Sequence, residues 1–135
     1  MEYKNIIADT NIWVAYFNKD DSDHLKTLKY EDLLMQDQTM PDLIFYETLT
    51  VLRNKSKTSF PLDAFVDYST KSIQIIIKLF YENNRDVLNL FIREHKDGLS
   101  YIDILLLYLS KEYHILTFDE KLKKRIKETG GKLVN

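Results

Sequence analysis

The stretch Asn5-Ile6-Ile7-Ala8-Asp9-Thr10-Asn11 decides the fold, because three apolar residues lead directly into an aspartate and a second apolar run begins at Ile12. This pattern predicts a short buried strand that ends at Asp9, followed by a helix capped by Thr10 or Asn11. In an open α/β sheet, binding sites lie at the carboxyl ends of the strands. Asp9 is therefore a candidate site residue, although an aspartate or asparagine in this position can equally serve only as a helix cap.

The composition is that of one soluble globular domain, residues 1–135, with 30% charged residues and a formal net charge of -2. Any attraction to nucleic acid must therefore be local. There is no cysteine, which excludes disulfides, thiolate zinc sites and cysteine nucleophiles. The first residues do not open a signal peptide, and the longest apolar run is too short to cross a bilayer. We expect a cytoplasmic protein with no membrane contact.

Apolar residues at helical spacing and short β-branched runs predict the other elements. Helices are predicted at residues 12–17, 24–35, 42–54, 62–70, 79–95, 100–112 and 120–129, and strands at 72–77 and 114–117, with weaker strand signals at 37–40 and 132–134. The strand at 72–77 is expected to be buried. Because helical segments separate the strands, the connections are crossovers and the sheet is parallel. The predicted fold class is α/β, a single-domain parallel sheet flanked by helices.

Two carboxylates lie on helix faces that should point into the protein. The residues three and four positions away from Glu47, and from Asp103, are apolar or hydroxyl-bearing. Both acids therefore lie on or beside a buried stripe, where an ionised carboxylate without a partner is costly. Each also has a simpler interpretation: Asp103 forms a capping pair with Ser100, and Glu47 is a borderline position turned towards solvent.

A further acid, Asp119, follows a predicted strand just as Asp9 does. The simpler interpretation is that Thr117 caps the next helix and Glu120 completes a capping box. Both interpretations of Asp119 remain open when the residue is considered alone.

Taken together, the four acids predict a metal site. In a parallel α/β sheet, the strand ends that carry Asp9 and Asp119 share one edge with the helix starts that carry Glu47 and Asp103. Carboxylates at about 4 Å would repel one another by roughly 4 kcal/mol per pair at an effective dielectric constant of about 20. A divalent cation removes that penalty, and oxygen ligands without cysteine favour Mg²⁺ or Mn²⁺ over zinc.

The order of these motifs resembles the PIN-domain nucleases, and most closely the small VapC-type toxins of toxin–antitoxin pairs. The resemblance extends from Ile6 to Val134 and is carried by Asp9-Thr10-Asn11, Phe45-Tyr46-Glu47-Thr48-Leu49, Leu99-Ser100-Tyr101-Ile102-Asp103 and Leu116-Thr117-Phe118-Asp119. It implies an endoribonuclease in which Asp9, Glu47, Asp103 and Asp119 form the catalytic metal site. Many members have small residues after the equivalent of Asp103, whereas this chain has Ile104-Leu105-Leu106-Leu107, so local packing is expected to differ.

The resemblance also implies supporting residues and partners. Asn11 would hold the geometry by hydrogen bonding, Thr117 would support the site from behind the metal ligands or through a water molecule, and Thr10 and Ser100 complete the supporting set. RNA is the implied substrate, and a cognate antitoxin, of a kind that often presents an arginine to the acids, is the implied protein partner. A homodimer is expected because family members commonly pair and because apolar positions appear in excess, namely Trp13, Tyr16, Phe17, Tyr81 and Phe91.

Because an acidic site repels RNA, basic groups must hold the RNA backbone beside it. Two clusters are candidates for this role: Arg53, Lys55 and Lys57 in one, and Lys121, Lys123, Lys124 and Arg125 in the other. The alternative is that both clusters are ordinary solvated surfaces.

Three functions remain open: an endoribonuclease toxin, a PIN nuclease of RNA maturation without a toxic role, and a PIN-like module that binds RNA or protein without catalysis. A neighbouring antitoxin gene would separate the first two. A degenerate binding module should lack some of the acids, and all four are present. A phosphatase of the haloacid-dehalogenase type needs a second aspartate two residues after the first, where this chain has Asn11.

Overall fold

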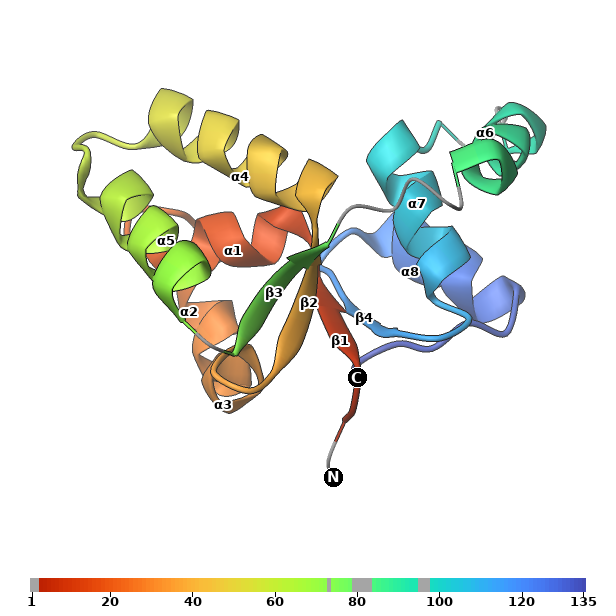
Figure 1. Ribbon diagram of the computed structural model, residues 1–135, viewed down its shortest axis with the longest axis horizontal. Helices are drawn as coiled ribbons and strands as arrows, with labels where there is room; N and C mark the ends of the chain where they lie inside the picture. Colours follow the sequence, from red (N-terminus) through yellow and green to blue (C-terminus); the bar gives the residue numbers. More distant parts are fainter. Residues whose placement is uncertain (1–2, 73, 79–83, 95–97) are drawn as a thin grey trace.

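The computed structural model describes residues 3–72, 74–78, 84–94 and 98–135. The centre of the molecule is a parallel four-stranded sheet in the order β3-β2-β1-β4 (Figure 1). The strands are β1 (Ile6–Ala8), β2 (Gln38–Pro41), β3 (Ile75–Lys78) and β4 (His114–Leu116). Ala8 pairs with Leu116, so Asp9 and Thr117 follow directly at the same edge of the sheet. The predicted α/β fold with a parallel sheet is confirmed.

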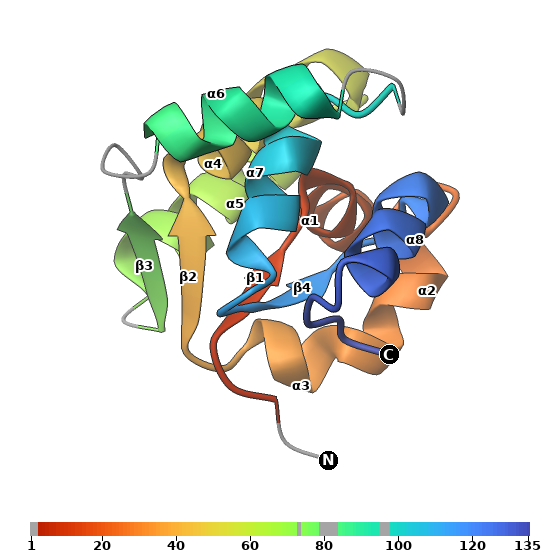
Figure 2. The same ribbon diagram turned by 90° about the vertical axis from the view of Figure 1, so that its right-hand side faces the viewer.

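Helices lie on both sides of the sheet. One side carries α1 (Thr10–Phe17), α4 (Asp42–Lys55) and α5 (Phe60–Lys71), together with the short segments α2 (His24–Thr27), η1 (Leu28–Tyr30) and α3 (Glu31–Leu34). The other side carries α6 (Asn84–Arg93), α7 (Tyr101–Leu109) and α8 (Glu120–Glu128). Helix α7 packs against both α6 and α8 (Figure 2). In the part of the chain that the structure describes, no helix combines the length and apolar character needed to span a membrane.

The core explains two features of the sequence. Ile6, Ile7 and Ala8 are at most 2% exposed, as expected for a central parallel strand that is covered on both faces. The four consecutive residues from Ile104 to Leu107 are also buried, because α7 lies between α6 and α8 and belongs to the same core as β1. Large apolar side chains fill this space, which accounts for the absence of small residues after Asp103.

Two predicted strands differ from the observed ones. The run at 72–77, of which residue 73 lies outside the described residues, forms β3 at Ile75–Lys78, and only Ile75 of this strand is buried: β3 is an edge strand in which Ile76 is 63% exposed. A β-branched run predicts a strand, but the position of that strand in a sheet depends on partners elsewhere in the chain. The segment 132–134 forms only an isolated bridge, between Leu133 and Ile115.

Helix boundaries also differ. The helix predicted at 24–35 is divided into α2, η1 and α3, and Leu25 and Leu28, which predicted its buried face, are 78% and 43% exposed. Helix α7 ends at Leu109 rather than at residue 112. Of the helix predicted at 79–95, α6 covers Asn84–Arg93, and residues 79–83 and 95 lie outside the described residues.

Most of the apolar positions that suggested a homodimer are used inside the monomer. Trp13 is 1% exposed, and Tyr16 and Phe17 pack against the core. Tyr81 lies outside the described residues, whereas Phe91 on α6 is 38% exposed. The expectation of a dimer therefore rests on a smaller apolar surface than the sequence indicated.

Candidate active site

Asp9 lies at the end of β1 and begins α1. Its backbone N–H donates to the Leu116 carbonyl at 2.8 Å, which continues the pairing of β1 with β4. One side-chain oxygen, Oδ1, accepts a 2.7 Å hydrogen bond from the Thr10 backbone N–H, so Asp9 itself caps α1. The prediction that Thr10 or Asn11 caps this helix is therefore wrong: the strand ends one residue earlier, and the aspartate occupies the cap position.

Asn11 and Thr117 connect the two strand ends. The Thr117 hydroxyl donates to Asp9 Oδ2 at 2.7 Å and accepts from the Asp119 backbone N–H at 3.1 Å. The Asn11 amide donates to Thr117 Oγ1 at 3.3 Å and to Asp9 Oδ2 at 3.5 Å, while its Oδ1 accepts from the Phe118 N–H at 3.3 Å. Because Thr117 is 2% exposed and Asp9 is 6% exposed, this network lies in the protein interior and fixes the orientation of the Asp9 carboxylate.

Asp119 and Asp103 both begin helices. Asp119 caps α8, since its Oδ1 accepts from the Leu122 N–H at 3.1 Å. The interpretation that Thr117 caps this helix is wrong, because the Thr117 hydroxyl is directed to Asp9 instead. Asp103 and Ser100 form a complete capping box, with bonds of 3.1 Å and 3.0 Å. The simpler interpretation of Asp103 is thus present in the structure, but it occupies only one carboxylate oxygen, Oδ2.

The four acids are electrostatic neighbours. Burial raises the pKa of Asp9 to about 6, against lowering by the hydrogen bonds from Thr117 and Thr10, and the charges of Asp103 and Glu47 raise it further. Burial also raises the pKa of Asp103, against lowering by Ser100, and the charge of Asp119 adds to the increase. The half-buried Glu47 comes from the second turn of α4, so four separate elements contribute to one acidic cluster.

The cluster has the chemistry of a Mg²⁺ or Mn²⁺ site, since all four side chains offer hard oxygen ligands and their mutual repulsion favours a cation. The four carboxylates lie farther apart than the ligands of a formed metal site. Among the residues that the structure describes, no three His, Cys, Asp or Glu side chains lie close enough together to hold a metal ion. The donor types therefore fit the metal, and the carboxylates would have to move closer together to bind it.

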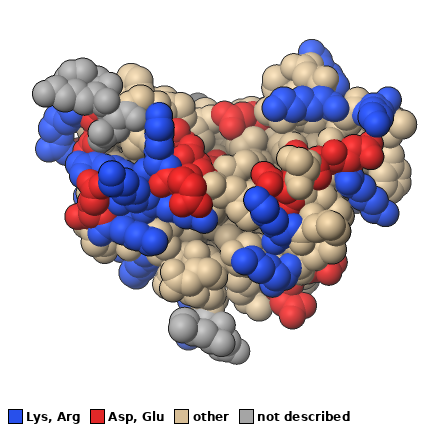
Figure 3. All heavy atoms as spheres, turned by 180° about the vertical axis from the view of Figure 1, so that it is seen from behind, with Lys and Arg blue, Asp and Glu red and all other residues tan. Residues whose placement is uncertain are grey.

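The predicted RNA-binding cations occupy different environments. Arg53, Lys55 and Lys57 are exposed at the far end of α4 from the sheet. Lys121 and Lys124 are exposed on α8, and Lys123 forms a 3.3 Å ion pair with Glu120. Figure 3 shows lysines and arginines gathered on the side of the molecule formed by α8, with acidic side chains among them.

Arg125 is the exception in this set. Its Nε donates to Glu94 Oε2 at 2.8 Å, its Nη2 to Glu94 Oε1 at 2.6 Å and its Nη1 to Glu128 Oε2 at 3.2 Å. The hydrogen bonds to Glu94 raise the pKa of the guanidinium further above its ordinary value. No local pattern indicated this contact, because Glu94 is 31 residues away from Arg125. The guanidinium joins α8 to the end of α6, which is a structural role.

Comparison with known proteins agrees with this arrangement. The PIN domain family model matches residues 6–128. Among solved structures, that of VapC20 from Mycobacterium tuberculosis, described as a toxin that cleaves the sarcin–ricin loop, superposes with a TM-score of 0.75 at 15% identity, covering 89% of this chain and 94% of that chain. A search of curated protein sequences found no match. Because the family model spans nearly the whole chain, this protein belongs to the PIN domain family.

Proposed function

We propose that this protein is a Mg²⁺- or Mn²⁺-dependent endoribonuclease, and that it is the toxin of a toxin–antitoxin pair. RNA as the substrate and an antitoxin as the partner are supported by the likeness of fold to VapC20, which is described as an RNA-cleaving toxin. The acidic residues at the carboxyl edge of the sheet support a hydrolytic site.

The observation that carries the proposal is the environment of Asp9. Its pKa is raised from 3.8 to about 6, mainly because the carboxyl group is buried. This difference corresponds to about 3 kcal/mol of destabilisation when the group is ionised at neutral pH. A helix cap alone does not require two further carboxylates, Glu47 and Asp103, beside a buried aspartate. A bound cation gives this costly arrangement a function.

The four carboxylates Asp9, Glu47, Asp103 and Asp119 would hold the metal. When bound, Mg²⁺ or Mn²⁺ would lower the pKa of a coordinated water molecule and would polarise a phosphate oxygen. The residues of this chain do the rest: Thr117 and Asn11 keep the Asp9 carboxylate oriented through hydrogen bonds to Oδ2. Asp103 accepts from Ser100 through Oδ2, which leaves Oδ1 for a metal or for the proton of an attacking water.

RNA would be held by cations on both sides of the cluster. The exposed groups Lys121 and Lys124 on α8, with Arg53 and Lys55 at the end of α4 and Lys57 just after it, can neutralise phosphates. Lys123 can join them because its pair with Glu120 is at the surface, where such pairs are weak. We leave Arg125 out of this set because its guanidinium binds Glu94 and Glu128.

A cleavage assay on purified protein tests the proposal. Wild-type protein with Mn²⁺ should cleave RNA, and Asp103→Asn or an excess of chelator should abolish cleavage. Asp63→Asn, which neutralises an exposed carboxylate in the first turn of α5, is the matched control and should retain activity. Equal cleavage by wild type and Asp103→Asn would mean that the acids are only helix caps. Growth arrest on expression, relieved by the antitoxin, separates a toxin from a maturation nuclease.

A further inference from the structure

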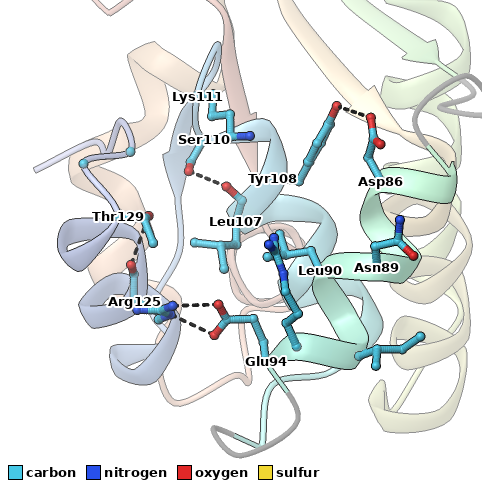
Figure 4. Close-up of a pocket in the computed structure, with 14 residues that line it drawn as sticks. Asp86, Asn89, Leu90, Glu94, Leu107, Tyr108, Ser110, Lys111, Arg125 and Thr129 are labelled. Atoms are coloured by element: carbon cyan, nitrogen blue, oxygen red, sulfur yellow. Dashed lines mark hydrogen bonds and ion pairs between the residues drawn. The ribbon is translucent and has the colours of Figure 1, made fainter.

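A groove of about 1000 Å³ lies between α6, the second half of α7 and the end of α8 (Figure 4). The apolar side chains of Leu90 and Leu107 line it, together with the glycines at 130 and 131 after α8. None of the four acids contributes to the lining. The groove is therefore separate from the acidic cluster, and the sequence motifs did not predict it.

The walls of the groove are held in place by polar contacts. The bidentate pair of Arg125 with Glu94 joins α8 to the end of α6, as Figure 4 shows. The Tyr108 hydroxyl donates to Asp86 Oδ2 at 3.2 Å, which joins α7 to the start of α6. These contacts also engage both acidic side chains of the lining, so neither presents a bare charge to an incoming anion.

Other polar groups of the lining remain open to a ligand. Within the described ranges, Arg93 and Lys111 form no ion pair and the Asn89 amide has no hydrogen bond. Lys111 Nζ lies 4.9 Å from the centre of the Tyr108 ring. These two cations, the Asn89 amide and the apolar floor are groups that bind the phosphates, the base edges and the apolar base faces of single-stranded RNA.

The groove lies where RNA leaving the acidic cluster can reach it. Asp103 and Asp119 stand at the starts of α7 and α8, and the groove is lined by later residues of the same two helices, from Leu107 and from Arg125 onwards. At 1.5 Å per residue, the groove begins roughly 6–9 Å along the helix axes from these acids. The exposed Lys121 and Lys124 lie on α8 along this route.

We propose that this groove is a second RNA-binding site, which holds nucleotides a short distance along the strand from the bond that is cleaved. This inference rests on the proposed nuclease function. An acidic, apolar peptide also matches two cations around an apolar floor. RNA is favoured because the groove follows the acidic cluster along the same two helices, and because Asn89 can recognise a base edge.

The test compares a groove variant with a charge-matched control. Arg93→Ala/Lys111→Ala removes two exposed cations of the groove, and Lys19→Ala/Lys71→Ala removes two exposed cations on the side of α1 and α5. All four positions are exposed, so both variants should fold, and thermal melting verifies this. The probe is a pool of random 12-nucleotide single-stranded RNAs, and affinity is measured in chelator so that nothing is cleaved.

The groove variant should bind the RNA pool about tenfold more weakly than the control. A pool containing 4-thiouridine should cross-link, on irradiation, to the peptide that carries Tyr108 and Lys111 in the wild type. Equal affinity of the two variants, cross-links confined to other peptides, or no RNA binding by the wild type would each overturn the proposal. Loss of antitoxin binding in the groove variant, with RNA affinity unchanged, would instead make the groove a protein-binding site.

The outcomes separate this proposal from the nuclease proposal. Groove-dependent RNA binding without metal-dependent cleavage would leave the groove assignment intact and refute the nuclease. Metal-dependent cleavage with groove-independent RNA binding would refute only the groove.

Discussion

The Thr117 hydroxyl donates a 2.7 Å hydrogen bond to Asp9 Oδ2, although the two residues are 108 positions apart in the sequence. The bond joins the ends of neighbouring strands β4 and β1, and both side chains are buried. It lowers the pKa of Asp9 against the effect of burial, so it favours the ionised form that a metal requires.

Thr117→Val tests this bond, because valine keeps the shape and removes the donor. The pKa of Asp9 should rise, metal affinity should fall by about 10- to 100-fold, and stability should fall by about 1–2 kcal/mol. Mn²⁺ titration and the pH profile of cleavage measure the first two effects, and urea unfolding measures the third. Thr50→Val, which removes a similar hydroxyl on the exposed face of α4, should leave metal affinity unchanged.

Asp9→Asn should make the stability of the metal-free protein less dependent on pH. Since the folded-state pKa of about 6 lies above the ordinary value of 3.8, the wild type is most stable below pH 4 with respect to this group and loses stability as the pH rises through 6. Asparagine carries no charge, although its amide NH₂ replaces one oxygen that accepts hydrogen bonds in the wild type. The loss of stability between pH 4.5 and pH 7.5 should therefore be about 1–2 kcal/mol smaller in the variant than in the wild type. Urea unfolding at pH 4.5 and pH 7.5 measures the difference, with Asp63→Asn as the control. An equal loss of stability between the two pH values in the wild type and in the variant would contradict the assigned effect of burial.

Millimolar Mn²⁺ should raise the melting temperature of the wild type, because a ligand that binds only the folded state stabilises it. The shift should be largely lost in Asp103→Asn and retained in Asp63→Asn. An absence of any shift in the wild type would show that the carboxylates do not close around a metal without RNA.

Lys121→Ala/Lys124→Ala should weaken RNA binding and leave the metal-induced thermal shift intact. Removing two phosphate contacts should flatten the slope of log affinity against log salt by about 1–2. Affinity measured at two salt concentrations checks this expectation. An unchanged slope would identify these lysines as ordinary surface residues.

Arg125→Lys should lower stability by about 1–3 kcal/mol, because lysine cannot make the bidentate contact with Glu94. The effect should be smaller than for a fully buried pair, because solvent screens the Arg125 side chain, which is 30% exposed, while that of Glu94 is 9% exposed. A double-mutant cycle with Glu94→Gln, followed by urea unfolding, isolates the pair. Arg85→Lys, an exposed substitution at the start of α6, the helix that directly precedes Glu94, is the control.

Local patterns predicted much of the fold, and they singled out four acids that lie within electrostatic reach of one another in the structure. An apolar run before Asp9 marks the end of a buried strand, and the apolar neighbours of Glu47 mark its inward face; neither signal needs the rest of the chain. A capping role for Asp9 was one of the two interpretations open from the sequence, but the preferred caps, Thr10 and Asn11, were wrong because the strand end was placed one residue too late. The contact of Arg125 with Glu94 and the edge position of β3 were also missed. Both depend on pairing between distant segments, which a local pattern does not encode.

The edge position of β3 has a consequence for handling the protein at high concentration. Within the described residues, one side of the β3 backbone has no neighbouring strand, and Ile76 and Ile77 beside it are 63% and 37% exposed. An apolar edge of this kind can add a strand from another molecule and begin aggregation. The strand is only four residues long and ends in Lys78, both of which limit such growth. Ile76→Lys, a change on the solvent side of the strand, should therefore raise the concentration at which the protein remains free of aggregates.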